Sequence, residues 1–329
     1  MNDGALWFTL GPCLALILAA EFVNGWTDAP NAIATVVSTR VLSPPLALLM
    51  ASVLNAIGAF SGTAVAATIG QGIIQPEAVD LQTVGAAMVA IVIWSTAAWY
   101  FGLPTSESHA LVSGLAGAGL AVAGPSVLLW EGWSKVLVGI LFSTFLGFAG
   151  GLTLMVTIYR FLSQESPAPM RKVFGRLQIV SAALMAFGHG SNDGQKFIGV
   201  FTLALVLGGV LPEFGVPYWV ILICALVMGM GTAVGGWRII KTMGLRMTKL
   251  EPVSGFAAET GAGLTILLAS HFGIPLSTTH TINTSIIGVG ATRRLSAVRW
   301  GVVGSIVTAW ILTFPICGAI AYAVARLLR

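Results

Sequence analysis

The stretch AFGHGSNDGQKFIGVFT, residues 186–202, places His189, Asp193 and Lys196 within eight residues of one another. The segments on either side of these three residues carry no charged side chain. Ionisable side chains in such an apolar setting are costly to bury, and in membrane proteins they usually mark a functional site. The stretch therefore predicts a site embedded among apolar helices.

This stretch has a counterpart near the start of the chain. EFVNGWTDAPNAIATVV, residues 21–37, aligns with it through four pairs: Phe22 with Phe187, Gly25 with Gly190, Asp28 with Asp193, and Ile33 with Ile198. Two further pairs follow in the same order: AATIG (66–70) with IKTMG (240–244), and LPTSESHALVSGLAG (103–117) with IPLSTTHTINTSIIG (274–288). A repeated order at nearly constant spacing indicates an internal duplication.

The composition places this duplication in a membrane. Of 329 residues, 56% are hydrophobic and 9% are charged, whereas soluble domains carry about 25% charged residues. A membrane-spanning helix needs about 20 apolar residues, and four uncharged runs are long enough: 41–76, 136–159, 214–237 and 301–325. The chain is predicted to be an all-α polytopic membrane protein, surrounded by membrane lipid.

Charge, cysteine usage and the lack of a catalytic pair argue against a nucleic-acid-binding protein, a disulfide-bonded or metal-binding protein, and an enzyme. The net charge of +4 resides in short loops between apolar runs, which is typical of membrane topology and not of nucleic-acid binding. Cys13, Cys224 and Cys317 are isolated in apolar segments, so neither a disulfide framework nor a metal motif is predicted. No nucleophile–base pair occurs, so we expect neither an enzyme nor a cofactor.

The basic loops predict the topology. The linker 160–176 and the segments 238–249 and 293–299 are rich in Lys and Arg, which places them in the cytoplasm. Each half then needs about five crossings, which in the first half fall at roughly 5–40, 45–70, 83–103, 104–124 and 134–162. Because five is odd, the second half would be inverted, as in many secondary transporters. A duplicated but static membrane protein is the alternative.

This topology divides the chain into three parts: a first transmembrane repeat (1–162), a cytoplasmic linker (163–176) and a second transmembrane repeat (177–329). Both termini are expected outside. The sequence leaves open whether the protein forms a homodimer.

The first acidic motif reads as a helix start inside the membrane. Gly25 would give backbone freedom, Thr27 or Asp28 would be the N-cap, and Pro30 would lie in the first turn. Asp28 and Asn31, three residues apart, share one helix face. The free N–H groups of such a helix start can bind an anion, while the carboxylate and the amide can hold a cation. The alternative is that Asp28 only caps its own helix.

The second acidic motif differs from the first at one informative position. Lys196 stands where the first copy has Asn31, so an ammonium group faces Asp193. Such a pair resembles a bound cation that never leaves. It could also be a structural ion pair, or Lys196 could contact an anionic substrate directly.

The proline motifs supply hydroxyl groups, which suit an oxyanion substrate. These are Ser106, Ser108, Ser277, Thr278 and Thr279. Each motif precedes a short apolar segment that could be re-entrant or broken, and in each a histidine follows three residues after a serine. Hydroxyl groups in a span often bond only their own backbone, but two matched groups favour a binding role. Glu107 lies among them, whereas Glu259 could lie at the membrane interface.

Together these motifs resemble the inorganic phosphate transporter (PiT) family. Its members carry a Gly-x-Asn-Asp-x-x-Asn-type signature and a Pro-x-Ser-x-x-His element in both halves. The likeness extends across nearly the whole chain, including RIIKTMG, EPVSGF and IPLSTTH. The resemblance implies a cation-coupled symporter for inorganic phosphate, with both termini outside.

Three departures from the family pattern bear on the coupling ion. Thr27 replaces the first signature asparagine, which Asn192 keeps in the second half. Lys196 replaces a second asparagine, and Asn55 stands where sodium-coupled members have a glutamate, while Glu259 looks like the glutamate retained in the other half. These departures resemble the bacterial proton-coupled branch, which takes up phosphate at the inner (plasma) membrane, often as a neutral metal–phosphate complex.

These considerations give a set of predicted site residues. For phosphate binding they are Ser106, Glu107, Ser108, Ser277, Thr278, Thr279, Asn192 and Lys196. For coupling to H⁺, or to Na⁺, they are Asp28, Asn31, Asp193, Asn55 and Glu259. Residues expected to orient the motifs are His109, His280, His189 and Asn24. No resident metal site is predicted, and the alternatives are a sulfate symporter of the same family or a passive anion channel.

Overall fold

The computed structural model describes residues 3–329; residues 1–2, at the start of the first predicted repeat, lie outside them. Within the described range the chain is a bundle of helices, with no β-strand and one isolated β-bridge between Ile74 and Leu128. The prediction of an all-α fold is confirmed.

The first half holds six α-helices: α1 (Asp3–Ser38), α2 (Pro44–Ala59), α3 (Ala64–Gly72), α4 (Leu81–Phe101), α5 (Glu107–Ala123) and α6 (Trp130–Leu162). Two 3₁₀ turns, η1 (Pro76–Ala78) and η2 (Pro125–Val127), lie in its loops. Local sequence sets the boundaries. Asp80 and Thr83 form a capping box at the start of α4, and Gly102 ends that helix with a left-handed φ of 69°, a conformation that glycine adopts without steric cost.

The second half holds seven α-helices: α7 (Pro167–His189), α8 (Gln195–Leu207), α9 (Tyr218–Val234), α10 (Trp237–Lys241), α11 (Pro252–His271), α12 (Thr278–Arg293) and α13 (Trp300–Leu327). Two π-helical turns, η3 (Gly190–Gly194) and η4 (Thr242–Arg246), and one 3₁₀ turn, η5 (Leu295–Ala297), interrupt them.

The two halves use the same order of elements. The helix α1, the bent pair α2–α3, then α4, α5 and α6 match α7–α8, the bent pair α9–α10, then α11, α12 and α13. The two bent pairs turn by 70° and 59°. In both halves, a short helix, α5 with 17 residues or α12 with 16, follows a proline motif.

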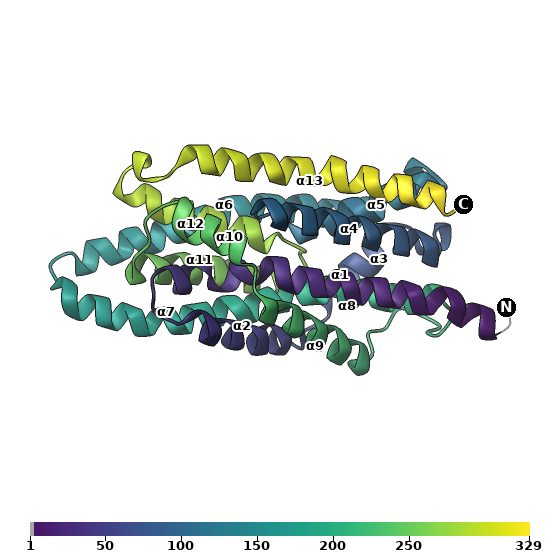
Figure 1. Cartoon of the computed structure of the whole chain (residues 1–329), viewed down its shortest axis with the longest axis horizontal. Coiled ribbons are helices and arrows are strands. Elements are labelled where there is room, and N and C mark those ends of the chain that lie inside the picture. Colours follow the sequence, from purple (N-terminus) through teal and green to yellow (C-terminus); the bar gives the residue numbers. More distant parts are fainter. Residues whose placement is uncertain (1–2) are drawn as a thin grey trace.

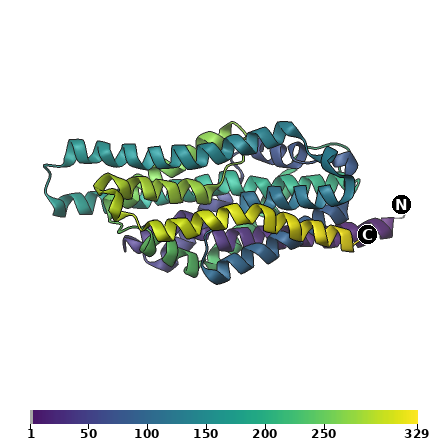
Figure 2. The ribbon, with the colours of Figure 1, turned by 90° about the horizontal axis from the view of Figure 1, so that it is seen from above.

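The first helices of the two halves run in opposite directions along the bundle. The helices lie roughly along one axis, with the start of α1 and the end of α13 at one end (Figure 1). The loop between α6 and α7 lies at the other end, and both views show these two helices reaching it together (Figures 1 and 2). The helix α1 therefore runs towards this loop, whereas α7 and α8 run away from it.

Five of the described helices are long and apolar enough to cross a membrane, or up to seven if each bent pair is one span. This count is lower than the prediction of about five crossings in each half. One reason is that α5 and α12, with 17 and 16 residues, are shorter than the about 20 residues that a span requires.

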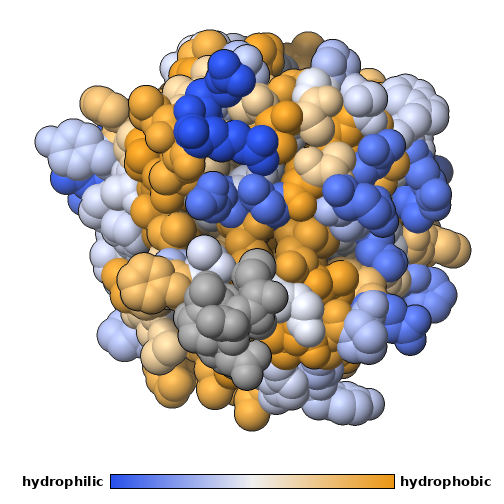
Figure 3. All heavy atoms as spheres, turned by 90° about the vertical axis from the view of Figure 1, so that its right-hand side faces the viewer, coloured by the Kyte–Doolittle hydropathy of each residue, from blue (hydrophilic) through white to orange (hydrophobic). Residues whose placement is uncertain are grey.

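The outer helices present an apolar surface suited to lipid. Large hydrophobic side chains such as Phe145 on α6, Leu222 on α9 and Ile311 on α13 are exposed. Hydrophilic residues instead gather on parts of the end face that carries the termini (Figure 3). The pattern is that of a helix bundle whose sides face hydrocarbon and whose ends face water.

The helix start predicted at the first acidic motif is wrong. The helix α1 is continuous from Asp3 to Ser38 and contains Pro30, so Asp28 lies mid-helix and does not cap it. A proline inside a helix removes one backbone hydrogen bond without requiring the helix to end. The ring packs closely on α9–α10, because a Cβ added at Gly236 would lie 2.8 Å from Pro30 Cγ.

The second acidic motif is not a helix start either. The chain passes from α7 into α8 through the π-helical turn η3, which contains Asn192 and Asp193. Such turns are rare and occur often at functional sites. The turn therefore distinguishes the second motif from the first, where the helix is regular.

The motif glycines permit close helix packing and do not supply backbone freedom. A Cβ at Gly190 would overlap the backbone of Asn55 on α2, and one at Gly25 would overlap the carbonyl of Met228 on α9. Both glycines are helical, with φ in the ordinary negative range. They let α2 and α9 approach the two acidic motifs.

The substitution Gly190→Ala is expected to destabilise the protein by about 1–3 kcal/mol, because the added methyl group has no space and the helices must separate. Thermal unfolding of the purified protein measures this. Gly304→Ala on α13 is the matched control, since a Cβ there has nothing within 4 Å. An equal loss in both variants would contradict the packing role of Gly190.

Candidate functional site

The predicted polar residues from both halves meet inside the bundle. Asp28 and Asn31 come from α1, Asp193 from η3, Lys196 from α8, and the hydroxyl groups from the starts of α5 and α12. All of these side chains are buried. The duplication thus produces one shared polar centre, called the central site below.

The first acidic motif contacts the proline motif of the other half. Asn31 donates from Nδ2 to Thr279 Oγ1 at 2.9 Å and to Thr278 Oγ1 at 3.3 Å. The Thr279 hydroxyl lies 3.4 Å from the nearer carboxylate oxygen of Asp28. These contacts join α1 to the first turn of α12.

The second acidic motif makes the mirrored contact. Lys196 donates to Ser108 on α5, to the carboxylate of Asp193 and, at 2.8 Å, to the carbonyl of Leu276. The three N–H groups of the ammonium therefore have three acceptors. In addition, the Thr278 hydroxyl donates to Asp193 at 2.6 Å. Lys196 is thus held in place, as expected for a permanently bound cation.

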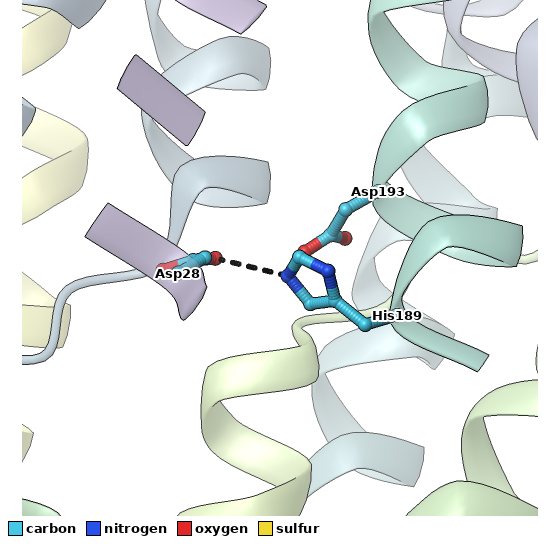
Figure 4. A group of neighbouring side chains, drawn as sticks. All are labelled: Asp28, His189 and Asp193. Carbon is cyan, nitrogen blue, oxygen red and sulfur yellow. Dashed lines mark ion pairs between the residues drawn. The ribbon is translucent and has the colours of Figure 1, made fainter. Parts of the chain in front are cut away.

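His189 links the two acidic motifs (Figure 4). Its Nε2 atom lies 3.2 Å from Asp193 Oδ2 and 3.9 Å from Asp28 Oδ2. Its Nδ1 atom lies 3.2 Å from Asn55 Oδ1. Asn55 is oriented by Thr232, which accepts from Asn55 Nδ2 at 3.0 Å and itself donates to Met228 O.

This orientation has a chemical consequence for the imidazole ring. Because the oxygen of Asn55 faces Nδ1, that nitrogen carries a proton and donates. A neutral ring would then point the lone pair of Nε2 at two carboxylates. The contact becomes favourable when Nε2 carries a second proton, or when a cation lies between the groups. Ligand atoms of Asp28, His189 and Asp193 lie within 4.8 Å of one another, which fits either case.

Glu107 belongs to the same region but faces α1 and α4. It accepts from Thr27 at 2.9 Å and from Ser95 at 2.7 Å. Thr27, which replaces the signature asparagine, therefore binds a carboxylate. Both oxygens of Glu107 have hydroxyl partners in this conformation.

Glu259 forms a separate buried cluster. It accepts from Thr35 on α1 and from Gln178 and Ser181 on α7, and among the described residues no cation contacts it. Its side chain is fully buried among helices. Thr35 lies two helical turns from Asp28, so the cluster is about 10 Å along α1 from the central site.

The prediction that Glu259 is the mirror image of Asn55 is wrong. Asn55 lies on α2, ahead of the bent segment α3, whereas Glu259 lies on α11, after the corresponding segment α10. The repeat therefore places them on different elements, and Asn55 contacts His189 instead.

His109 and His280, which were expected to orient the proline motifs, contact each other where the two motifs meet. No ring nitrogen of either residue has a partner in the described part of the chain. The rings instead pack edge-to-face with centroids 4.5 Å apart, and His280 stacks on Trp310 at 3.7 Å. The two histidines join the halves by packing.

The serine–histidine spacing has a backbone explanation. Ser106 and Ser277 are the N-caps of α5 and α12, and each accepts from the backbone N–H of the histidine three residues later. An N-cap serine satisfies one of the free N–H groups of a helix start. The two serines therefore fix the helix starts that present the neighbouring hydroxyl groups.

Two predicted asparagines bond elsewhere. Asn24 donates to Glu21 at 2.9 Å, and Asn192 donates to Ser270 at 3.0 Å. Asn192 thus ties η3 to the end of α11, not to the hydroxyl groups of the central site. Glu21, a further acidic candidate one turn from the first motif, is fully buried.

The sequence reasoning missed Ser95, Gln178 and Ser181. Gln178 and Ser181 are three residues apart in an apolar stretch of α7 and share one helix face. That spacing was the signal that could have found them. Ser95 is isolated in α4 and gave no comparable signal.

The arrangement can bind an anion beside fixed cations. The helices α5 and α12 both start within the bundle and touch there, since Ser108 donates to Leu276 O at 2.9 Å. The first N–H groups of a helix have no acceptor within it, and they attract anions. Next to them lie the ammonium of Lys196, the imidazole of His189 and three acidic side chains.

The fold and this central site define a polytopic membrane transport protein: charged side chains from both halves converge inside an apolar bundle. A family model described as the phosphate transporter family matches residues 24–321. The chain belongs to the phosphate transporter family.

The chain is also similar to individual relatives. It is 47% identical over 304 residues to a probable low-affinity inorganic phosphate transporter of Rhizobium meliloti (strain 1021), covering 92% of this chain and 91% of the relative. A protein of Bacillus subtilis (strain 168) with the same description is 40% identical and covers 93% of each. Both relatives are described as transporters, not enzymes.

A solved structure titled the sodium-dependent phosphate transporter shares the fold. Its TM-score is 0.82 at 24% sequence identity, covering 98% of this chain and 99% of that chain. At this level of identity the likeness concerns the fold alone.

Proposed function

We propose that this protein takes up inorganic phosphate across the cell inner (plasma) membrane by symport with protons. The observation that carries the proposal is the ammonium of Lys196, tethered at the second acidic motif, with the titratable ring of His189 within 4 Å of both carboxylates. A built-in ammonium balances the carboxylate of Asp193 without a metal ion. The family match supports phosphate as the substrate.

Phosphate would bind at the starts of α5 and α12. The hydroxyl of Thr279 and the first N–H groups of both helices supply neutral donors. The hydroxyls of Ser108 and Thr278 join them when they turn from Leu276 O and Asp193, to which they donate in this structure. Lys196 contacts Ser108, so its charge lies beside this pocket. Phosphate near neutral pH keeps a proton that it can donate to a carboxylate, which sulfate lacks; a buried acceptor left unpaired would disfavour sulfate.

Coupling would use the first half of the central site. Asp28 and Asn31 have no lysine beside them, so they can take a proton, or Na⁺, from the outer solution. His189 would exchange a proton with Asp28 and Asp193, which both lie within 4 Å of it. A divalent metal carried with phosphate as part of the substrate would fit the three ligand atoms of Asp28, His189 and Asp193.

The two halves would alternate access as an inverted repeat. The opposite directions of α1 and α7–α8 (Figure 1) support this, as does the shared order of elements. Residues 1–162 and 177–329 would be the repeats, and 163–176 a cytoplasmic linker. The basic residues of this linker favour the cytoplasmic side, and both termini would then lie outside.

Uptake of radiolabelled phosphate into proteoliposomes tests the proposal. Uptake should follow an inward proton gradient without sodium and should resist excess sulfate. A requirement for sodium would overturn proton coupling, and accumulation of sulfate would overturn the substrate. Fast movement of phosphate down its gradient without proton uptake would instead indicate a passive anion channel.

The substitution Glu259→Gln is expected to slow proton-driven uptake by about tenfold or more and to flatten its pH dependence. Glutamine keeps the size of the side chain but cannot bind and release a proton. Its neighbours Thr35 and Ser181 can donate or accept, so the fold should be retained. Uptake measured between pH 5.5 and pH 8 checks this, with Glu213→Gln in the exposed loop between α8 and α9 as control. An unchanged pH profile would show that Glu259 takes no part in proton coupling.

A further inference from the structure

A basic cleft lies at the end of the bundle where α6 and α7 meet, away from the central site. It has a volume of about 580 Å³ and is bounded by the end of α1 and the starts of α7 and α11. Three cations line it: Arg40, Arg171 and Lys249. The only acidic residue in its lining, Glu251, is paired with Arg293 at 3.1 Å.

The three cations of the basic cleft have no protein partner. Within residues 3–329, none of them makes an ion pair or a side-chain hydrogen bond. Like charges gathered around one hollow repel each other, and an anion in the hollow would relieve that repulsion. The cleft is therefore positively charged, and no carboxylate of the described residues pairs with its three cations.

Helix geometry adds to this positive field. Pro167 and Pro252, which line the cleft, are the first residues of α7 and α11. Helix starts carry a partial positive charge. Ser166, the N-cap of α7, makes no side-chain cap bond. Pro167 and Pro169 have no N–H group and Met170 N–H bonds to Ser166 O, so in this first turn Ala168 offers a free N–H to a ligand.

Arg40 occupies an unusual position in the cleft. Its φ is 60°, and it is the one described non-glycine residue with positive φ. This left-handed position just after a helix is one where glycine is favoured. An arginine there keeps a cation in the cleft at a conformational cost.

The cleft connects to the Glu259 cluster through hydrogen bonds. Thr39, which lines the cleft, donates to Gln178 Oε1 at 2.9 Å, and Gln178 donates to Glu259 at 3.3 Å. An anion in the cleft would therefore lie at one end of a chain that reaches a buried carboxylate.

We propose that the basic cleft is a second anion-binding site, which takes a phosphate group at the membrane surface. The group comes either from free inorganic phosphate or from the headgroup of an anionic lipid. This site lies apart from the central site, and its binding does not depend on the coupling ion proposed above.

Binding of radiolabelled phosphate to the purified full chain in detergent, measured by equilibrium dialysis, tests the first source. The wild type should bind two phosphates, and Arg171→Gln/Lys249→Gln should weaken one of the sites by about tenfold. Arg176→Gln/Arg246→Gln is the matched control, since it removes the same charge from exposed residues outside the cleft and should retain both sites. Added salt should weaken only the cleft site, because its charges face solvent.

A second variant separates binding from folding. Arg40→Gly removes a cation and also relieves the left-handed backbone, so its Tm should be equal to or above that of the wild type. Its cleft site should still bind phosphate more weakly. If Arg40→Gly and Arg171→Gln/Lys249→Gln both bound phosphate as fully as the wild type, the proposal would be overturned.

Nanodiscs distinguish the lipid source. If a headgroup fills the cleft, then wild type and control should retain phosphatidylglycerol in native mass spectrometry, and the Arg171→Gln/Lys249→Gln variant should lose it. If wild type, cleft variant and control each bind one phosphate and show this lipid pattern, the cleft is filled by a lipid headgroup. Equal phosphate and equal lipid binding by all proteins contradicts both sources.

Discussion

The substitution Lys196→Asn is expected to lower the free energy of unfolding by about 3–5 kcal/mol, because it removes the ammonium of a buried ion pair and leaves the Asp193 carboxylate with only His189 and Thr278 beside it. It also removes the donor to Ser108 and to the Leu276 carbonyl, which lie beside the proposed phosphate pocket. Thermal unfolding of the purified protein in detergent measures the loss.

The double variant Asp193→Asn/Lys196→Asn provides the control. It removes both charges, so most of the stability should return, because removing a whole buried ion pair is often nearly neutral. If the pair is only structural, this variant should transport phosphate at a rate close to that of the wild type. If Lys196 is the built-in cation of the central site, the variant should fold but require sodium or fail to accumulate phosphate. Equal destabilisation of single and double variants would contradict the pairing.

The substitution Asp28→Asn is expected to abolish proton-driven accumulation of phosphate while leaving the fold intact. Asparagine has nearly the shape of aspartate and can still accept from Thr279, but it cannot take up a proton or hold a cation. One charge moved through 100 mV supplies about 2.3 kcal/mol, so a variant that loses one coupled charge should lose an accumulation ratio of roughly 50-fold. Uptake into proteoliposomes under an imposed potential measures this ratio.

Two further measurements, a control variant and a phosphate-exchange assay, separate a loss of coupling from a loss of phosphate binding. Asp80→Asn, at the half-exposed start of α4, should accumulate phosphate normally, since asparagine is an equally good N-cap. Exchange of phosphate across the membrane without a gradient should persist in Asp28→Asn if phosphate binds at α5 and α12. Undiminished accumulation by Asp28→Asn would show that the coupling charge enters elsewhere, and Glu259 would then be the next candidate.

The two halves of the site are chemically unequal. The second motif holds its own ammonium, whereas the first motif has an amide at the equivalent position. His189 lies between them. In the proposed mechanism the first motif takes its positive charge from the solution, so that the centre combines one permanent charge with one exchangeable charge.

Residue spacing predicted which side chains would meet. The paired motifs placed Asp28, Asp193, Lys196 and the hydroxyls of the proline motifs in one site, and the structure brings these residues together. Spacing succeeded here because equivalent positions in two copies of one fold occupy equivalent places around the interface between them.

Local sequence signals were less reliable for helix boundaries. The Gly–Pro pattern around Asp28 is typical of a helix start, yet α1 continues through it. Continuity is possible because Pro30 costs only one hydrogen bond and its ring packs against Gly236. Whether a proline ends a helix depends on such neighbours, which the local sequence does not reveal.

By itself, the sequence determined the apolar helical fold, the duplication and the identity of the central charged residues. These features follow from the length of the uncharged runs and from the order of the paired motifs, both of which can be read directly from the chain. Only the tertiary structure decided the partners of those residues: His189 between two carboxylates, Glu259 among Thr35, Gln178 and Ser181, and the basic cleft at the far end. Each of these depends on helices distant in the chain approaching within a few ångströms, and the strength of hydrogen bonds and ion pairs changes steeply over that range.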